Sequence, residues 1–555
     1  MQLTGADILI RTLIEQGCDT VFGYPGGQIL NVYDSLYKYQ NEIRHMLTAH
    51  EQGAAHAADG YARATGKVGV VMSTSGPGAT NLVTGIATAY LDSIPLVAIC
   101  GNVPTTQIGT DSFQEIDITG VTLPITKHNC FVGSVENLAD TIREAFALAQ
   151  SGRPGPVLID VPKDVQTAVC DYEPQAPVQP EERHAAKDVR IKEAAALINA
   201  SKRPFIYFGG GLITSEAQEE MLALAEKIDA PIGCSLMGLS GIPTDHPRFL
   251  GMQGMHGHYA SSMAMHDADL IISLGVRFND RVTGNREKFA KLAQIIHVDV
   301  DGSELSKTVN SACGLRGDVK LTLQKLIPLV SAEQKPDWEK AVKALKETEN
   351  DYLDIRPGLT PRNAIMTLNK HLGENTAVAT DVGQHQMWAA QNVSFKKPRR
   401  FISSGGLGTM GFGLGAAIGA AVGTGERSVL VTGDGSFGMC LNELTTAVTY
   451  NVPVVILLMN NGVLGMVRQW QTLFFNKHYS NTILDRKTDF VALARAFGAD
   501  GEAVDTVAAL DKAFEHAFSC DGPYVIDCRI DKDEFVLPML PPGGSMDDII
   551  MKVGE

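Results

Sequence analysis

The chain has 555 residues, which suggests three or four compact domains at about 150 residues each. Hydrophobic residues make up 44% and charged residues 20%, so collagen-like and disordered proteins are excluded. Lysine and arginine number 47 and aspartate and glutamate 63, a net charge of −16. Because phosphate backbones attract basic proteins, this charge argues against a nucleic-acid partner.

The cysteines and the first residues bear on the compartment. The nine cysteines include no CxxC pair, and an odd number fits a reducing compartment better than a disulfide framework. Residues 1–7 have neither a basic nor an apolar leader segment, so we expect a cytoplasmic protein. Two uncharged stretches, 68–91 and 401–425, have the length of membrane spans, but their glycines and proline indicate close-packed loops and helices. No membrane association is expected.

Short apolar runs rich in β-branched residues recur between amphipathic segments. In chain order they are 67–72, 95–100, 156–161, 204–208, 269–274, 295–300, 376–380, 428–432, 453–459 and 523–527. Each run is typical of a buried parallel strand, and helix-length pieces such as 137–150 lie between them. The alternation predicts an α/β protein with doubly wound parallel sheets.

Composition shifts divide the chain into segments. We expect a first domain (1–170), a proline-containing linker (171–187), a central domain (188–335), a charged linker (336–361), a third domain (362–537) and a tail (538–555). The charged linker should contain a solvated helix over 337–350. The tail either closes over a site or is disordered.

The first and third domains share a sequence pattern. Residues 94–99 resemble 452–457, and residues 155–160 resemble 522–527, at a similar spacing. We infer that these two domains are copies of one fold and that the central domain is a different α/β unit.

A candidate cation site follows two strands of the third domain. The Gly-Asp-Gly-Ser run 433–436 comes directly after one predicted strand, and Asn461 comes just after the next. Doubly wound sheets bind ligands at the carboxyl ends of their strands. Asp434 and Asn461 offer the oxygen ligands that Mg²⁺ prefers, and Mg²⁺ usually keeps phosphate oxygens in its shell. A common strand-end turn is the alternative.

The Gly-Asp-Gly run, followed at one strand-helix-strand interval by an Asn-Asn pair, resembles the signature of thiamine diphosphate-dependent enzymes. The resemblance implies three α/β domains: the first and third bind the pyrimidine and diphosphate ends of the cofactor, and the middle one is a Rossmann-like FAD-binding domain. It also implies that Asp434, Asn461 and the backbone carbonyl of Val463 hold Mg²⁺.

The resemblance extends to other cofactor-binding positions. Glu51 would be the catalytic acid, donating to the aminopyrimidine nitrogen so that the thiazolium C2 proton can be removed. Further positions match the family's cofactor-binding loops. On the pyrimidine side these are Tyr24, Pro25, Gly26, Thr74 and Asn81, and on the diphosphate side Gly383, Gln384, His385, Gly408, Met410, Gly433, Gly435, Ser436, Met466 and Val467. The run 406–411 also satisfies the GxGxxG dinucleotide pattern, which leaves an NAD-dependent dehydrogenase as a rival from another class.

The chain resembles most closely, over nearly its whole length, the catalytic subunits of the acetohydroxyacid synthase, or acetolactate synthase, family. The segments 20–27, 113–115, 151–156 and 465–471 carry this resemblance. It implies decarboxylation of pyruvate on thiamine diphosphate and condensation of the hydroxyethyl carbanion with a second 2-oxo acid, pyruvate or 2-oxobutyrate. The products would be 2-acetolactate or 2-aceto-2-hydroxybutyrate, in valine, leucine and isoleucine biosynthesis. A homodimer or homotetramer with active sites at the dimer interface is implied as well.

The family resemblance assigns the remaining catalytic positions. With Glu51 they are Gln114, Lys163, Arg281 and Trp470. Gln114 would bind the reaction intermediate, and the Arg281 guanidinium would bind the second substrate's carboxylate as a planar fork. Trp470 would shape a pocket that favours 2-oxobutyrate over pyruvate.

The resemblance further implies a structural FAD, because the reaction has no net redox change. The matching positions are Arg153, Gly209, Gly210, Gly211, Met255, His256, Gly275, Arg277, Asp299 and Asp318. Two residues depart from the family pattern: Asn279 stands where an acid is common, and Gly415 stands where a proline is usual.

Several interpretations stay open at this point. They are an FAD-containing biosynthetic synthase, a catabolic acetolactate synthase without flavin or a pyruvate oxidase-like relative, and an inactive cofactor-binding protein that acts through a partner. The residues also leave open whether a small regulatory subunit binds and which second 2-oxo acid predominates.

Overall fold

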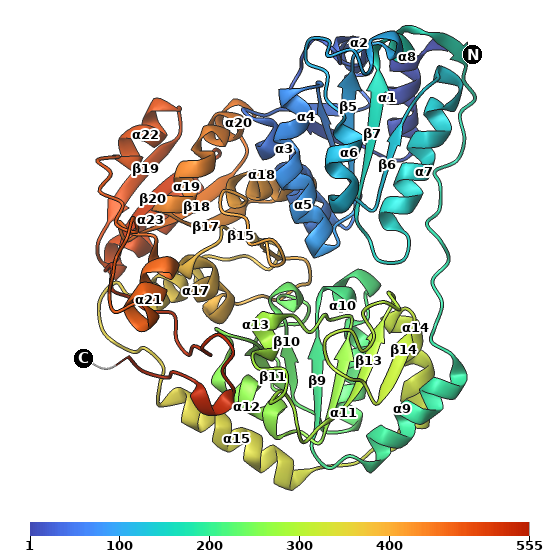
Figure 1. Cartoon of the computed structure of the whole chain (residues 1–555). Helices are drawn as coiled ribbons and strands as arrows, with labels where there is room; N and C mark the ends of the chain where they lie inside the picture. The colour runs from blue at the N-terminus through green and yellow to red at the C-terminus, as the bar shows by residue number, and fades with distance from the viewer. Residues whose placement is uncertain (554–555) are drawn as a thin grey trace. The chain divides into compact units, whose positions relative to one another are not determined.

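A computed structural model describes residues 1–553, which contain three six-stranded sheets flanked by helices (Figure 1). The chain divides into two compact units. Unit 1 comprises 1–182, 376–385 and 402–530, and unit 2 comprises 183–375, 386–401 and the stretch from Asp531 onward. Among residues 1–553, no helix has the length and apolar character needed to cross a membrane. The predicted α/β class is confirmed.

The first sheet of unit 1 has the strand order β3-β2-β4-β5-β7-β6, and every pairing in it is parallel. Its strands are β2 (Thr20–Gly23), β3 (Arg44–Leu47), β4 (Gly69–Ser73), β5 (Leu96–Asn102), β6 (His128–Phe131) and β7 (Pro156–Pro162). Its helices are α1 (Gly5–Glu15), α2 (Leu30–Lys38), α3 (Glu51–Thr65), α4 (Pro77–Asn81), α5 (Val83–Asp92), α6 (Ile118–Thr122), α7 (Leu138–Gln150) and α8 (Lys163–Thr167). Strands β1 (Gln2–Thr4) and β8 (Val169–Asp171), one before and one after these strands in the sequence, form a separate short antiparallel pair.

The second sheet has the order β16-β15-β17-β18-β20-β19. Its strands are β15 (Ala377–Thr380), β16 (Phe401–Ile402), β17 (Ser428–Gly433), β18 (Val454–Asn460), β19 (Asp500–Val504) and β20 (Tyr524–Arg529). The accompanying helices are α18 (Gly413–Thr424), α19 (Asp434–Cys440), α20 (Leu444–Thr449), α21 (Gly465–Phe474), α22 (Phe490–Ala496) and α23 (Val507–Ser519). Helix α17 (Gln384–Asn392) begins in unit 1 and continues into the part of the chain that belongs to unit 2.

These two sheets are copies of one arrangement. When the strands of each sheet are numbered in chain order, both sheets run 2-1-3-4-6-5. The matching sequence segments fall on equivalent strands, since 94–99 and 452–457 lie at β5 and β18. The pair 155–160 and 522–527 lies in the same way at β7 and β20. The inferred duplication is therefore confirmed.

The sheet of unit 2 has the order β11-β10-β9-β12-β13-β14 and is entirely parallel. Its strands are β9 (Pro204–Phe208), β10 (Ile232–Cys234), β11 (Phe249–Met252), β12 (Leu270–Leu274), β13 (Gln294–Asp299) and β14 (Cys313–Arg316). Its helices are α9 (Asp188–Ala200), α10 (Gly210–Ser215), α11 (Gln218–Lys227), α12 (Tyr259–Asp267), α13 (Asp280–Thr283), α14 (Val319–Leu326), α15 (Pro336–Asn350) and α16 (Pro361–Leu368). Numbered in chain order the strands run 3-2-1-4-5-6, the order of dinucleotide-binding doubly wound sheets. The expected Rossmann-like topology is confirmed.

The helix expected at 337–350 exists as α15, but it is not wholly solvated. Trp338 and Val342 are buried in the core of unit 2, and the Trp338 indole donates to the Pro204 carbonyl at 3.0 Å. The charge run masked these apolar positions at helical spacing.

The tail packs against the rest of unit 2. The Leu540 N–H donates to the Met255 carbonyl at 2.7 Å, and Met539 and Ile550 exchange backbone hydrogen bonds of 2.9 and 2.8 Å. Through residue 553 the tail is therefore an ordered segment of this unit.

In unit 1, small residues let α3 and α18 approach backbone to backbone. A Cβ at Gly419 would overlap the Ala57 carbonyl oxygen, and a Cβ at Gly60 would overlap that of Ala416. At Gly415, where the family usually has proline, a Cβ would lie 2.8 Å from the Gly53 carbonyl oxygen. This crossing joins the two copies of the fold within unit 1.

We predict that Gly419→Ala lowers the free energy of unfolding by about 1 to 3 kcal/mol, because the added methyl group overlaps backbone that cannot rotate away. Urea unfolding followed by circular dichroism measures the change. Gly27→Ala is the control, since within residues 1–553 no atom beyond Gly27 and its two chain neighbours lies within 4 Å of a Cβ there. Equal midpoints for Gly419→Ala and the unmodified protein would contradict the close approach.

Candidate active site

The predicted pyrimidine-side residues gather at the carboxyl ends of the first sheet. Tyr24 follows β2, Glu51 follows β3, Thr74 follows β4 and Lys163 follows β7. This common edge is where a doubly wound sheet binds its ligand.

Side chains and backbone connect these strand ends. The Thr74 hydroxyl accepts the Gln28 N–H at 3.2 Å, and the Thr74 side chain fills the space that a Cβ at Gly26 would need. The Lys163 ammonium donates to the Gly27 carbonyl at 3.2 Å. The loop that contains Pro25 and Gly26 is thereby held against β4 and β7.

Glu51 is the first residue of α3, and a residue of α4 binds its side chain. Asn81 donates its side-chain N–H to Glu51 Oε2 at 3.0 Å. A Cβ at Gly78 would lie 3.3 Å from Glu51 Oε1, so glycine there leaves room for the carboxylate. The backbone of Gln114, at φ 63, lies against Gly76 of the same loop, with its carbonyl oxygen 3.0 Å from a Cβ built there. The structure thus brings Glu51, Asn81 and Gln114 to one loop.

The predicted diphosphate-side residues gather at the equivalent edge of the second sheet. Asn461 donates to Gln384 Oε1 at 3.4 Å, and its own oxygen accepts the Val463 N–H at 3.2 Å. Gln384 also donates to Gln469 at 3.0 Å. Asp434 is buried at the start of α19, and burial raises the pKa of its carboxyl group to about 6.

His385 offers a buried nitrogen at this edge. Burial lowers its pKa to about 3, so the ring is neutral at physiological pH. Among the described residues its Nε2 has no hydrogen-bond partner. Cβ atoms at Gly383 and Gly433 would lie 2.7 and 2.9 Å from the ring, so the glycines make space for it. A carboxyl group, an amide oxygen and a neutral imidazole are the groups that suit a cation and a phosphate.

The loop that carries Gly408 and Met410 is fixed by buried acids. Asp381 accepts the Gly411 and Gly413 N–H groups at 2.7 and 3.2 Å, and the Thr432 hydroxyl donates to its second oxygen at 2.9 Å. The Met410 methyl group lies 3.8 Å from a Cβ built at Gly435. The loop is therefore held over the start of α19.

A second anchor comes from the first copy of the fold. Asp92 accepts the Gly405 and Gly406 N–H groups at 3.0 and 2.7 Å. Arg63 pairs with Asp92 at 2.9 Å and donates to the Ser403 carbonyl at 2.8 Å. No motif pointed to Asp92 or Arg63. Asp381 begins the run 381–385, which the family resemblance placed on the diphosphate side.

Three predicted residues near α19 and α21 lie at the start of these helices. The Ser436 hydroxyl donates to the Val382 carbonyl at 3.1 Å. Met466 and Val467 lie in the first turn of α21, where Val467 is exposed. Trp470, further along α21, packs edge-on against Phe474 at 5.8 Å between ring centres.

The glycine loops predicted for FAD meet at the centre of the unit 2 sheet. The Gly209 N–H donates to the Leu274 carbonyl at 3.1 Å, and the Gly211 N–H donates to the Gly275 carbonyl at 2.9 Å. Gly275 has φ 55, and a Cβ at Gly211 would lie 2.6 Å from the Gly275 Cα. These loops follow β9 and β12, where the strand order reverses, which is the nucleotide-binding point of such sheets.

The other predicted FAD residues have varied surroundings. Asp318 caps α14 by accepting the Leu321 N–H at 3.0 Å, and Asp299 accepts the Asp301 N–H at 2.8 Å. Burial lowers the pKa of His256 to about 4, and among residues 1–553 its Nδ1 has no partner. Arg153 belongs to unit 1, where it donates to Ser93 at 2.8 Å. Arg277 follows β12, just after Gly275.

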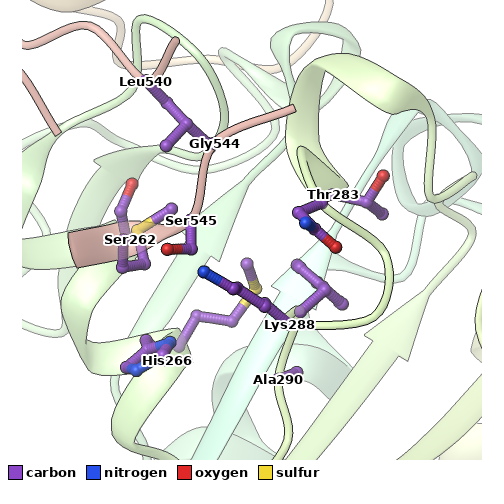
Figure 2. Close-up of a pocket in the computed structure, with 12 residues that line it drawn as sticks. Ser262, His266, Thr283, Lys288, Ala290, Leu540, Gly544 and Ser545 are labelled. Atoms are coloured by element: carbon purple, nitrogen blue, oxygen red, sulfur yellow. The ribbon is translucent and has the colours of Figure 1, made fainter. Parts of the chain in front are cut away.

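Unit 2 also contains Arg281, the residue predicted to bind the second substrate, and a pocket. The Arg281 side chain is 59% exposed and lies 3.5 Å from Asp280. Figure 2 shows a pocket walled by the tail residues Leu540, Gly544 and Ser545 and by side chains of 262–290. None of the sequence-predicted site residues lines this pocket.

Family models match all three parts of the chain. The N-terminal TPP binding domain of thiamine pyrophosphate enzymes matches residues 3–121, the central domain matches 191–326, and the C-terminal TPP binding domain matches 381–528.

Similar proteins span the whole chain. The acetolactate synthase large subunit of Buchnera aphidicola subsp. Acyrthosiphon pisum is 44% identical over 100% of this chain and 99% of its own length. The acetolactate synthase large subunit of Corynebacterium glutamicum is 45% identical over 100% of this chain and 91% of its own length. The acetolactate synthase isozyme 2 large subunit of Escherichia coli is 44% identical over 99% of this chain and 100% of its own length.

We predict that Asp381→Asn folds normally while Asp381→Ala loses about 2 to 4 kcal/mol of unfolding free energy. The asparagine oxygen keeps both glycine N–H bonds, and its amide can donate to the Thr432 hydroxyl, which turns to the Gly433 carbonyl 3.4 Å away. Alanine leaves both glycine N–H groups without an acceptor. Urea unfolding of both variants measures the difference.

The pH dependence of the same variants tests the buried carboxyl group. Burial raises the Asp381 pKa from 3.8 to about 6. The folded state therefore keeps a proton that the unfolded state loses, and its unfolding free energy falls by about 2 kcal/mol as pH rises from 4 to 6. Asp381→Asn should lack this component. An identical pH profile for the variant and the unmodified protein would contradict the assignment.

Proposed function

The chain belongs to the acetolactate synthase large-subunit family of thiamine pyrophosphate enzymes, and on this premise we propose the reaction and the residues that perform it. The protein decarboxylates pyruvate and joins the two-carbon unit to pyruvate or 2-oxobutyrate, forming 2-acetolactate or 2-aceto-2-hydroxybutyrate for branched-chain amino-acid biosynthesis. The observation that supports this best is the pair of polar strand-end clusters, around Glu51 and around Asp434, on two copies of one sheet.

The diphosphate-side residues fit the cofactor that the family uses. Asp434, the Asn461 oxygen and the Val463 carbonyl would hold Mg²⁺, and the unpartnered Nε2 of His385 would donate to the diphosphate. Thiamine diphosphate supplies a stabilised carbanion for bond cleavage and formation next to a carbonyl group. Glu51, held by Asn81, would donate a proton to the aminopyrimidine ring.

A complete site needs both clusters, and we propose that it forms between two subunits. Glu51 and Asp434 follow strands of different sheets, so one cofactor has to reach from one copy of the fold to the other. A homodimer or homotetramer in which each subunit supplies one cluster meets this requirement. The relatives are named as large subunits, which supports a small regulatory subunit as a further partner.

Four residues would handle the 2-oxo acids. The exposed guanidinium of Arg281 suits a carboxylate, and its neighbour Asp280 is only loosely paired at 3.5 Å. Gln114 and Lys163 lie at the carboxyl edge that Glu51 shares. Trp470 would form a wall that discriminates by about 1 to 3 kcal/mol for one extra methylene group.

We propose that unit 2 binds FAD as a structural cofactor. The strand order and the close approach of Gly211 to Gly275 support a nucleotide at the point where the order reverses. Asn279, in place of the acid common in the family, leaves one negative charge fewer near the flavin. We also propose that the domains have the boundaries expected from the sequence and that the protein is cytoplasmic.

We predict that the protein purified with thiamine diphosphate and Mg²⁺ forms acetohydroxybutyrate from pyruvate and 2-oxobutyrate, and that this activity requires FAD. Gas chromatography of the decarboxylated products and flavin absorbance measure both. Acetolactate formation that is indifferent to FAD would indicate a catabolic synthase. Dye reduction by pyruvate without a ligated product would indicate a pyruvate oxidase and contradict the proposed reaction.

A further inference from the structure

Glu443 is a buried acid that the proposed mechanism does not use. It lies directly before α20 in the second copy of the fold and is 1% exposed. Its carboxylate accepts hydrogen bonds from the Ala49 N–H at 3.1 Å, the His50 N–H at 2.9 Å and the Thr446 hydroxyl at 2.7 Å. Two of its three donors are thus the backbone groups directly before Glu51.

The whole connection from β3 to α3 is held by its amides. The Leu47 N–H donates to the Tyr450 hydroxyl at 2.9 Å, and the Thr48 N–H donates to the Gly23 carbonyl at 3.2 Å. The next two N–H groups are those that Glu443 accepts. All four amides of 47–50 are therefore satisfied, and three of them by side chains of 443–450.

The contact continues into the first turn of α3. A Cβ at Gly53 would lie 2.6 Å from the Glu443 Cγ and would overlap its carboxylate. The Glu443 side chain is thus wedged against the helix turn that carries Glu51. A negative charge at the N-terminus of this 15-residue helix also stabilises its first turn.

We propose that Glu443 is a positioning residue for Glu51: by clamping the Ala49 and His50 amides it fixes where the Glu51 carboxylate stands. The inference rests on the proposed function, because it gives Glu51 its catalytic role. Glu443 acts through the backbone and does not itself touch substrate or cofactor.

Amide hydrogen exchange of the cofactor-free protein tests the clamp directly. In Glu443→Gln we expect the Ala49 and His50 amides to exchange about tenfold faster or more, because an amide oxygen replaces only one of the two carboxylate oxygens. Glu15→Gln is the matched control, since Glu15 is a buried carboxylate of the same unit that pairs with Arg143 at 2.8 Å. Unchanged exchange at 49 and 50 in Glu443→Gln would overturn the proposal.

Gly53→Ala provides a second route should Glu443→Gln fold poorly. The new methyl group displaces the Glu443 carboxylate without removing its charge. The same two amides should exchange faster. Protection equal to that of the unmodified protein would overturn the proposal.

A double-mutant cycle with Glu51→Gln tests the functional consequence. The readout is deuterium exchange at C2 of bound thiamine diphosphate, followed by NMR. We expect Glu443→Gln to slow this exchange about tenfold with cofactor affinity retained, and to add no further loss in the Glu51→Gln background. Equal losses in both backgrounds would show that Glu443 does not act through Glu51.

The two proposals fail in different ways. Rapid C2 exchange in Glu51→Gln would refute the catalytic role of Glu51 and with it the proposed function. Slow exchange in Glu51→Gln together with normal exchange in Glu443→Gln would refute only the positioning role of Glu443.

Discussion

The close contact between α3 and α18 is the interaction on which both candidate half-sites depend. Helix α3 begins with Glu51, crosses α18 at glycines in its middle, and near its end places Arg63 where it anchors the loop of Met410. The helix is almost entirely buried, so its two ends cannot move independently. One rigid element therefore couples the pyrimidine-side acid of this chain to its diphosphate-side loop.

Buried carboxyl groups fix several loops around this helix by accepting hydrogen bonds from their backbone. Asp381, Glu443 and Asp92 accept backbone N–H groups from segments far away in the sequence. Burial raises the pKa values of Asp381 and Glu443, and the hydrogen bonds that each receives act in the opposite direction. Such groups give directional anchoring that apolar packing lacks, at the cost of desolvating a carboxylate.

The sheets were predictable because their strands are buried on both faces. Runs such as 156–161 and 453–459 have to be apolar and β-branched, and that pattern is visible without a partner strand. Asp434 and Asn461 were predictable for a related reason, since polar residues directly after such runs come to one edge of the sheet. The duplication also showed in the sequence, because equivalent strands carry similar residues.

The residues that the sequence did not indicate all act through long-range contacts. Glu443 meets Ala49 and His50 nearly four hundred positions away, and nothing near Glu443 in the chain distinguishes it from a surface acid. Trp338 lay within a charge run, and the packing of the tail depends on Met255. A single sequence shows local patterns, whereas these contacts are set by which elements the fold brings together.

Complementation between subunits tests the central claim most directly, namely that Glu51 and Asp434 act in one site contributed by two chains. Glu51→Gln and Asp434→Ala are each expected to be inactive alone. Co-expressed in equal amounts they should recover about a quarter of normal activity, because half of the dimers then hold one intact site of two. Activity no higher than that of either variant alone would contradict a site shared between subunits.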